Sequence, residues 1–286
     1  MEIKTVGVVG AGLMGSGIAQ TCAQAGCKVY VREINQELLD RGLARIYGAW
    51  DMLQGKGRIT AGQVAEYREH IQGTLRLLDF KTCDLVVEAA VENLDLKREI
   101  FKELDSILRP QALIASNTSS LPVIEMAAVT KRPERVAGLH FFNPAPVMKL
   151  VEIVRTIATS DATTDTLRTF AGTLGKTPIV AKDTGGFVVN FLLIPYLLAA
   201  VRMFENGVAS KEDIDTGMKL GCGYPMGPFQ LLDYVGLDTT LYAAEAIYKD
   251  YPDPAYAPPT LLRRMVAAGH NGMKSGKGFF DYPEKR

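Results

Sequence analysis

One of the three histidines lies close in sequence to a carboxylate with apolar neighbours. His140 lies in a strand-like segment, 135–142 (RVAGLHFF), and Glu152 lies in a second one, 149–154 (KLVEIV). Two strands joined by a short proline-containing turn usually fold back on each other; folding about Pro146 places 140 opposite 152, each six residues away. A buried carboxylate is costly unless it is paired, and a facing imidazole would become oriented and more basic. The pair could transfer protons as a catalytic base, or it could be an ordinary buried polar pair.

A glycine-rich segment near the N-terminus has the pattern of a dinucleotide-binding turn. A β-branched run, 5–9, precedes it, and a helix-like stretch, a strand-like segment and the acid Glu33 follow it. The turn consists of Gly10, Ala11, Gly12, Leu13, Met14 and Gly15. In this pattern the glycines allow a tight turn and close approach of a pyrophosphate, which binds at the helix N-terminus. Glu33 would accept hydrogen bonds from ribose hydroxyls and repel a 2′-phosphate, which favours NAD over NADP, although the neighbouring Arg32 weakens that preference.

Two other polar stretches could bind ligands. Residues 116–120 (SNTSS) follow a strand-like segment, and the carboxyl ends of parallel strands are where open α/β sheets bind ligands. Ser119 is therefore a candidate site residue, although the same cluster could cap the next helix. Lys56 and Arg58 lie in a polar turn between two helix-like segments; their charges could bind an anion or form only a solvated corner.

The order of the elements predicts two domains. Strands and helices alternate up to about residue 184, and from there on only helices are evident, at 187–206, 211–220, 226–248 and 260–268. This order is typical of an α/β fold. We expect a Rossmann-type NAD-binding domain with a mostly parallel sheet at 1–184, a helical-pair insertion at about 35–72, and an all-helical substrate and dimerisation domain at 185–286. Pro195 should kink its long apolar helix, and a second subunit should cover part of that helix.

Composition excludes several classes of protein. The 286 residues carry no net charge and no block of basic residues, which argues against nucleic acid or an anionic membrane as the main partner. The four cysteines have neither metal-ligand spacing nor the density of a disulfide framework, so we expect no metal site and reduced thiols. The N-terminus lacks the regions of a secretory signal, and the longest apolar run, 187–201, is interrupted and short for a bilayer. These features predict a cytoplasmic protein.

Seven segments, in order along nearly the whole chain, resemble those of L-3-hydroxyacyl-CoA dehydrogenases, and particularly the short bacterial 3-hydroxybutyryl-CoA dehydrogenases. They are GAGLMGSGIAQ from Gly10, DLVVEAAVENLDLK from Asp84, ASNTSSL from Ala115, HFFNPAPVMKLVEIV from His140, DTGGFVVN from Asp183, YPMGPFQLLDYVGLD from Tyr224 and KSGKGFFDY from Lys274. Seven ordered matches are far more specific than any one motif.

The resemblance implies a role for each matching residue. His140 corresponds to the catalytic base, Glu152 to the acid that orients it, and Ser119 and Asn190 to residues that hydrogen-bond the reacting substrate oxygen. The implied NAD contacts are Gly10 to Gly15, Glu33, Glu92, Lys97, Ser119, Asn143 and Lys274. Lys56 matches a residue that contacts coenzyme A, and we extend this role to Arg58. The implied substrate is an acyl-CoA thioester of fatty-acid or butyrate metabolism, and the expected assembly is a homodimer formed through the helical domain.

Three positions depart from the family pattern. Glu33 replaces the usual Asp and should keep the ribose contact; Gly185 replaces a common Pro and should loosen the interdomain segment; Phe191 replaces an Arg frequent in long-chain relatives. Two other functions stay open. One is a related dehydrogenase of a free 3-hydroxy acid or sugar acid, which would not need the Lys56 turn. The other is a catalytically silent NAD-binding structural protein, against which the intact His140 and its predicted partners argue.

Overall fold

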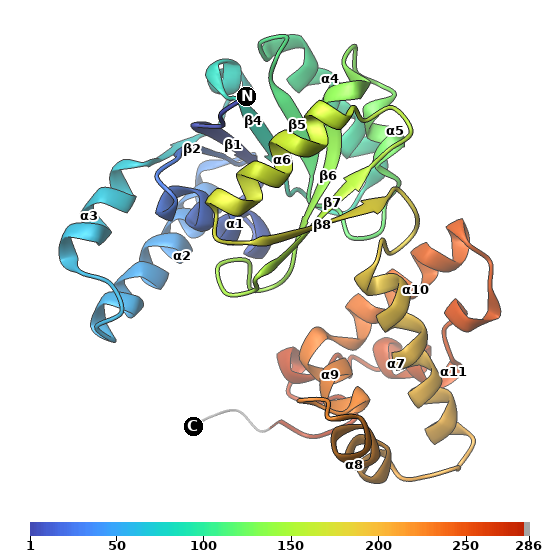
Figure 1. Ribbon diagram of the computed structural model, residues 1–286. Helices are drawn as coiled ribbons and strands as arrows, with labels where there is room; N and C mark the ends of the chain where they lie inside the picture. The colour runs from blue at the N-terminus through green and yellow to red at the C-terminus, as the bar shows by residue number, and fades with distance from the viewer. Residues whose placement is uncertain (283–286) are drawn as a thin grey trace. The chain divides into compact units, whose positions relative to one another are not determined.

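The computed structural model describes residues 1–282, and the chain divides into two compact units (Figure 1). The first unit is Met1–Asp183 and the second begins at Thr184. This division falls one residue before the predicted boundary. In the described part of the chain no helix has the length and apolar character that crossing a membrane requires.

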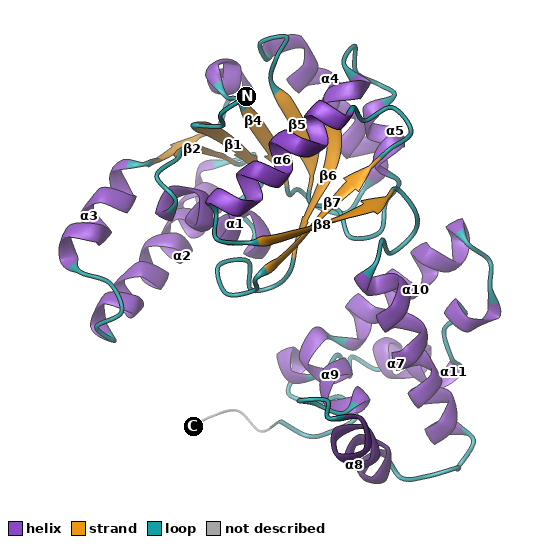
Figure 2. Ribbon diagram, viewed as in Figure 1, coloured by secondary structure: helices purple, strands orange, loops and turns teal. Residues whose placement is uncertain are grey.

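The first unit is built on one eight-stranded sheet in the order β3-β2-β1-β4-β5-β6-β7-β8 (Figure 2). The strands are β1 (Thr5–Val9), β2 (Lys28–Arg32), β3 (Ile71–Thr74), β4 (Leu85–Glu88), β5 (Leu113–Ser116), β6 (Val136–Phe141), β7 (Leu150–Arg155) and β8 (Thr177–Lys182). Neighbouring strands are parallel except β6 and β7, which are antiparallel. The predicted mostly parallel sheet is confirmed. The strand order reverses between β1 and β4, the place where open α/β sheets bind ligands.

Helices cover both faces of this sheet. On one face α1 (Leu13–Gln24), α2 (Gln36–Gly55) and α6 (Asp161–Thr173) share a single hydrophobic core with the strands. Elsewhere α4 (Leu94–Ile107) and α5 (Val123–Ala127) pack against each other, and α5 also contacts β6. Asn35, Asn93 and Ser160 start α2, α4 and α6, where each side chain accepts a hydrogen bond from a first-turn amide.

The predicted helical pair is present, but its second helix is shorter than predicted. It is α3 (Ala61–Glu69), and Ile71 and Gln72 belong to β3 instead. Pairing with β2 at the sheet edge overrides the helical pattern there, because only the strand buries the side chain of Ile71. Figure 1 shows α2 and α3 running side by side. Trp50 is buried between them, with its ring centroid 6.0 Å from that of Tyr47 and 5.6 Å from that of Tyr67.

Apart from isolated β-bridges of Lys277 with Gly272 and Asp281, the regular elements in the described part of the second unit are helices. Its helices are α7 (Val189–Glu205), α8 (Lys211–Cys222), α9 (Pro228–Val235), α10 (Leu237–Asp250) and α11 (Thr260–Ala267), and they enclose their own apolar core. Short 3₁₀ turns across the two units are η1 (Leu77–Thr82), η2 (Pro133–Arg135), η3 (Pro254–Tyr256) and η4 (Met273–Ser275). The single helix predicted at 226–248 is wrong. Gly236, at φ 102°, separates α9 from α10, because this backbone conformation cannot continue a helix.

Both ends of the segment between the units are anchored within their own unit. The carboxylate of Asp183 accepts hydrogen bonds from the amides of Val123 (2.9 Å) and Ile124 (2.7 Å), so it caps α5. The amide of Gly185 donates to Asp250 Oδ2 at 3.0 Å. Proline could not make this second bond because it has no N–H. Gly185 therefore lacks the stiffness of the proline that is common at this position in the family, but it makes a hydrogen bond that proline could not make.

Candidate active site

The predicted pairing of His140 with Glu152 is confirmed. The two residues face each other in the register of β6 and β7, and His140 Nδ1 lies 2.7 Å from Glu152 Oε2. His140 is 6% exposed and Glu152 is fully buried. Because β6 runs parallel to β5 and β7 runs back, the end of β6 and the start of β7 meet at the carboxyl-end edge of the sheet.

The geometry of this pair determines which nitrogen can exchange a proton with a substrate. A carboxylate only accepts hydrogen bonds, so Nδ1 of His140 carries the proton that points to Glu152. The other ring nitrogen, Nε2, is then the basic atom. The ring of Phe142 lies 4.5 Å from that of His140, centroid to centroid, and limits the orientations open to the imidazole.

The glycine-rich turn between β1 and α1 fits a dinucleotide. Gly10 has φ 95°, and a Cβ there would lie 2.6 Å from the carbonyl oxygen of Ala89. A Cβ on Gly15 would lie 1.9 Å from the carbonyl oxygen of Gly10, whereas one on Gly12 would meet nothing within 4 Å. The first and third glycines therefore permit close packing, and the second leaves an open approach to the N-terminus of α1. A pyrophosphate there would meet backbone N–H groups and the positive end of the helix dipole.

Glu33 lies beside this turn, just past the end of β2. Its Oε1 accepts a hydrogen bond from the amide of Ala11 at 2.6 Å, and Oε2 accepts one from the amide of Ile34 at 3.1 Å. The longer side chain of Glu therefore reaches the turn, as expected for a group that would bind the adenosine ribose.

Sequence reasoning missed Arg45, which holds the turn from α2. Its Nη1 donates to the carbonyl oxygen of Ala11 at 2.9 Å and lies 3.3 Å from Ser16 Oγ. Gly42, one helical turn earlier, lets α2 approach, because a Cβ there would lie 2.3 Å from that of Ala11. No motif marks this contact. The only signal in the sequence is a glycine three residues before an arginine on a helix.

A buried ionic network supports the loop that carries Ser119. The Lys97 side chain is 1% exposed, and its Nζ lies 2.7 Å from Glu88 Oε1 and 3.1 Å from Glu92 Oε2. Glu92 in turn accepts hydrogen bonds from the hydroxyl of Thr118, the amide of Ser119 (3.3 Å) and the hydroxyl of Ser120 (3.3 Å). Lys97 thus lies beneath the loop as a support for Glu92, and its direct contact with NAD stays a prediction.

The structure brings several predicted residues together in the first unit. The loop of Ser119 follows β5, and His140 is on the neighbouring β6. The Asn117 side-chain oxygen links the Ser119 loop to β6, because it accepts a hydrogen bond from the amide of Phe141 at 2.9 Å. Asn143 is exposed in the next turn, before a cis peptide bond to Pro144.

The remaining predicted residues belong to the α2–α3 hairpin or to the second unit. Lys56 and Arg58 are exposed at the tip of the α2–α3 hairpin, on either side of Gly57. Asn190 and Lys274 belong to the second unit. Asn190 is in the first turn of α7, as predicted, and Lys274 Nζ lies 2.6 Å from Asp238 Oδ1.

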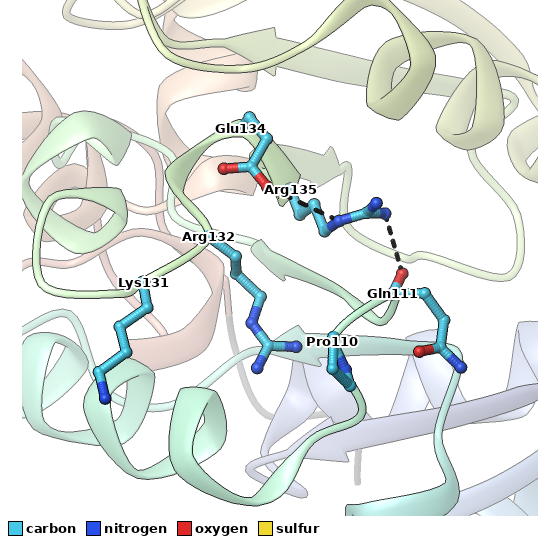
Figure 3. A pocket seen from close by; sticks show the side chains of 6 residues that line it. All are labelled: Pro110, Gln111, Lys131, Arg132, Glu134 and Arg135. Atoms are coloured by element: carbon cyan, nitrogen blue, oxygen red, sulfur yellow. Dashed lines mark hydrogen bonds and ion pairs between the residues drawn. The ribbon is translucent and has the colours of Figure 1, made fainter.

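A basic hollow of about 450 Å³ lies at the opposite edge of the sheet, before β5 and β6 (Figure 3). Its arginines already have partners. Arg132 Nε lies 2.6 Å from Asp105 Oδ1, its Nη2 donates to the carbonyl oxygens of Asp105 and Leu108, and Arg135 donates to that of Gln111. These contacts fix the end of α4. Because the hollow lies at the opposite edge of the sheet, it is separate from the candidate site.

Two family models together cover nearly the whole chain. The model for the 3-hydroxyacyl-CoA dehydrogenase NAD-binding domain matches residues 5–184, and that for the C-terminal domain matches residues 186–282. A 3-hydroxybutyryl-CoA dehydrogenase of Mycobacterium tuberculosis is 47% identical over 98% of this chain and 99% of its own length. The human mitochondrial hydroxyacyl-coenzyme A dehydrogenase is 46% identical, over 98% of this chain and 91% of its own length.

A solved structure agrees over the full length. The crystal structure of (S)-3-hydroxybutyryl-CoA dehydrogenase PaaH1 from Ralstonia eutropha has a TM-score of 0.95 and 45% identity, covering 99% of this chain and 100% of PaaH1. Sequence, fold and the geometry of the His140 pair thus agree. The chain belongs to the 3-hydroxyacyl-CoA dehydrogenase family, with an NAD-binding domain followed by the family's C-terminal domain.

Proposed function

We propose that the protein is an NAD-dependent dehydrogenase that interconverts a short-chain (S)-3-hydroxyacyl-CoA, with 3-hydroxybutyryl-CoA as the expected substrate, and the corresponding 3-oxoacyl-CoA. The observation that carries the proposal is the buried contact between His140 Nδ1 and Glu152 Oε2 at 2.7 Å, on the ligand-binding edge of a dinucleotide-binding sheet. The names of the full-length relatives support the short acyl chain.

Proton transfer is the task of His140 in this proposal. Nε2 takes the proton of the substrate hydroxyl during oxidation and returns it during reduction, and a neutral imidazole suits this exchange near neutral pH. Glu152 keeps the proton on Nδ1 and stabilises the imidazolium that forms. NAD bound at the glycine-rich turn would supply the acceptor for the hydride that leaves the substrate carbon. Because both side chains are buried, their mutual attraction is stronger than it would be in water.

The remaining residues bind and orient the reactants. Ser119 and Asn190 would hydrogen-bond the reacting oxygen as its charge develops. Glu33, Glu92, Asn143 and Lys274 would hold NAD, and Lys56 and Arg58 would bind the phosphates of coenzyme A. Large apolar side chains are exposed on α7 and α8, among them Leu192 and Leu220, and they support a homodimer formed through the helical unit. The cytoplasmic location stays a prediction.

The test is the variant His140→Gln. We expect it to fold and to bind NADH normally but to lose turnover of acetoacetyl-CoA by on the order of 10³-fold, the contribution of a positioned general acid–base. His270→Gln is the matched control, because His270 lies in the helical unit and outside the proposed machinery. Retained turnover in His140→Gln would remove His140 as the base. Absence of NADH formation by the unmodified protein with any 3-hydroxyacyl-CoA would favour the alternative of a catalytically silent NAD-binding structural protein.

A further inference from the structure

The turn between β6 and β7 is held by a lysine that none of the roles above includes. Lys176 immediately precedes β8 and is 7% exposed. Its ammonium donates to the carbonyl oxygens of Ala145 at 2.6 Å and Met148 at 2.7 Å. The two acceptors lie on opposite sides of the turn, so one charged group ties them together.

This contact is costly to maintain, which argues against an incidental role. An ammonium loses its hydration when it is buried, and the acceptors of Lys176 among the described residues are the two neutral carbonyls. Burial, with a smaller effect from Lys149, lowers the pKa of Lys176. Cys22 is nearby but is no counter-ion, because burial raises the pKa of its thiol well above the ordinary value and keeps it neutral. A hydrogen bond that involves a charged group is stronger than one between neutral groups, so it can hold a turn firmly.

The same turn rests on α1 from its other side. A Cβ on Gly17 of α1 would lie 3.1 Å from that of Ala145, so helix and turn are in close contact. Within the turn, the amides of Val147 and Met148 donate to the carbonyl oxygen of Pro144. The turn is thus clamped between the start of β8 and the helix whose N-terminus would face the pyrophosphate. Asn143 is attached directly to this clamped turn.

The two ends of NAD can be told apart on this sheet. Glu33 follows β2 and marks the adenosine ribose, whereas His140 is on β6 and marks the place of hydride transfer. We propose that Lys176 is a positioning residue for the nicotinamide half of NAD: by clamping residues 144–148 it fixes Asn143 relative to the glycine-rich turn. This inference rests on the proposed function, in which Asn143 contacts NAD.

The experiment compares two ligands on Lys176→Gln and Lys176→Met. NADH carries both halves, and ADP-ribose lacks the nicotinamide. We expect the Kd of NADH to rise about tenfold, because a displaced Asn143 would lose about one hydrogen bond to NAD, while the Kd of ADP-ribose changes less than about twofold. Lys149→Gln is the matched control, because Lys149 is an exposed lysine of the same turn, and both affinities should stay unchanged. Hydrogen exchange of the Val147 and Met148 amides in the free Lys176→Gln protein should become faster.

Two outcomes would overturn the inference: equal losses of NADH and ADP-ribose affinity, which mean a general loosening, or no loss of either. Should the Lys176 variants not fold, Gly17→Ala perturbs the turn from α1, and it should also weaken NADH more than ADP-ribose. Asn143→Ala separates the inference from the proposed function. Weak NADH binding in Asn143→Ala with normal NADH binding in Lys176→Gln would overturn the role of Lys176 and leave the Asn143 contact in place. Normal NADH affinity in Asn143→Ala would refute the Asn143 contact, and with it the route by which Lys176 is proposed to act.

Discussion

At the scale of single residues, each buried carboxylate in residues 1–282 is met by specific donors. Glu152 faces His140, and Glu88 accepts hydrogen bonds from Lys97 at 2.7 Å and from the Ser116 hydroxyl at 2.6 Å. Asp233 in the helical unit accepts the amides of Phe279 and Phe280, both at 2.8 Å. Removing one partner from such a pair leaves the other uncompensated. These sites are therefore the ones at which conservative substitutions should have large effects.

The variant Glu152→Gln should separate two effects of Glu152 on His140, the orientation of the imidazole and the stabilisation of its positive charge. The amide can still accept the proton on Nδ1 of His140, but it cannot stabilise the imidazolium. We expect kcat to fall by on the order of 10²-fold while the Kd of NADH stays unchanged. Steady-state rates with acetoacetyl-CoA and NADH titrations measure the two quantities. An unchanged kcat would mean that the carboxylate contributes no charge stabilisation to the reaction.

At the scale of elements, side chains replace hydrogen bonds that the backbone cannot make. Pro195 lies inside α7 and has no N–H, so the carbonyl oxygen of Phe191 loses its partner within the helix. The hydroxyl of Tyr256 donates to this oxygen at 2.9 Å. Burial raises the pKa of Tyr256, which keeps the hydroxyl protonated. The proline is thus accommodated by a contact from a segment far along the chain.

Tyr256→Phe tests this compensation. The substitution removes this partner of the part-buried carbonyl of Phe191, and the free energy of unfolding should fall by about 1–2 kcal/mol. Tyr251→Phe is the control, because Tyr251 also stacks on Phe191, at 5.9 Å between ring centroids, but is half exposed. Urea denaturation measures both variants. Equal stability losses in the two would mean that ring packing, and not the hydroxyl, supports α7 at Pro195.

The α2–α3 hairpin is a second element with a separable task. Its own aromatic core around Trp50 should keep it folded when its tip is changed. Lys56→Ala and Arg58→Ala should therefore raise the KM for acetoacetyl-CoA about tenfold each and leave the Kd of NADH unchanged, because each removes one phosphate contact. Arg41→Ala is the control, because Arg41 is an exposed arginine of α2 that lies far from the tip of the hairpin. An unchanged KM in both tip variants would favour the reading in which the substrate is a free acid.

At the scale of the whole molecule, each unit has its own apolar core, and the cysteines of the two units differ in burial. Cys22, Cys27 and Cys83 are buried in the first unit, whereas Cys222 is exposed in the second. Burial is the main cause that raises the pKa of all three buried thiols, that of Cys83 to about 12. The thiolate is the reactive form, so the buried thiols are protected by burial and by their protonation state.

Thiol labelling should report the integrity of the first unit. At pH 8 we expect Cys222 to react rapidly with a maleimide, and the three buried cysteines to react only after unfolding. Because their pKa values are raised, the buried groups stay neutral thiols as the pH rises through 8 and would ionise only well above it. Cys222→Ser should abolish the fast phase. A second fast thiol in the native protein would mean that the first unit opens locally.

The sequence by itself determined the elements whose signals are local. The glycine-rich turn with Glu33, the register of His140 against Glu152 and the helix that starts near Asn190 are all as predicted. Each depends on residues that lie within about two dozen positions of one another, and a short turn fixes the register of a strand pair. Family-specific segments then identified the fold and the NAD-binding domain.

Tertiary structure alone decided the features whose partners are distant in sequence. Ile71 joins a strand because β2 offers an edge, and Lys97, Arg45 and Lys176 have their roles because folding brings acceptors to them. From the sequence alone, a lysine or arginine on a helix or at a strand end is interpreted as a solvated charge. Its spacing does not reveal which carbonyl or carboxylate it contacts in the folded protein. The sequence thus determined which residues could do the chemistry, and the packing of distant segments decided which residues hold them in place.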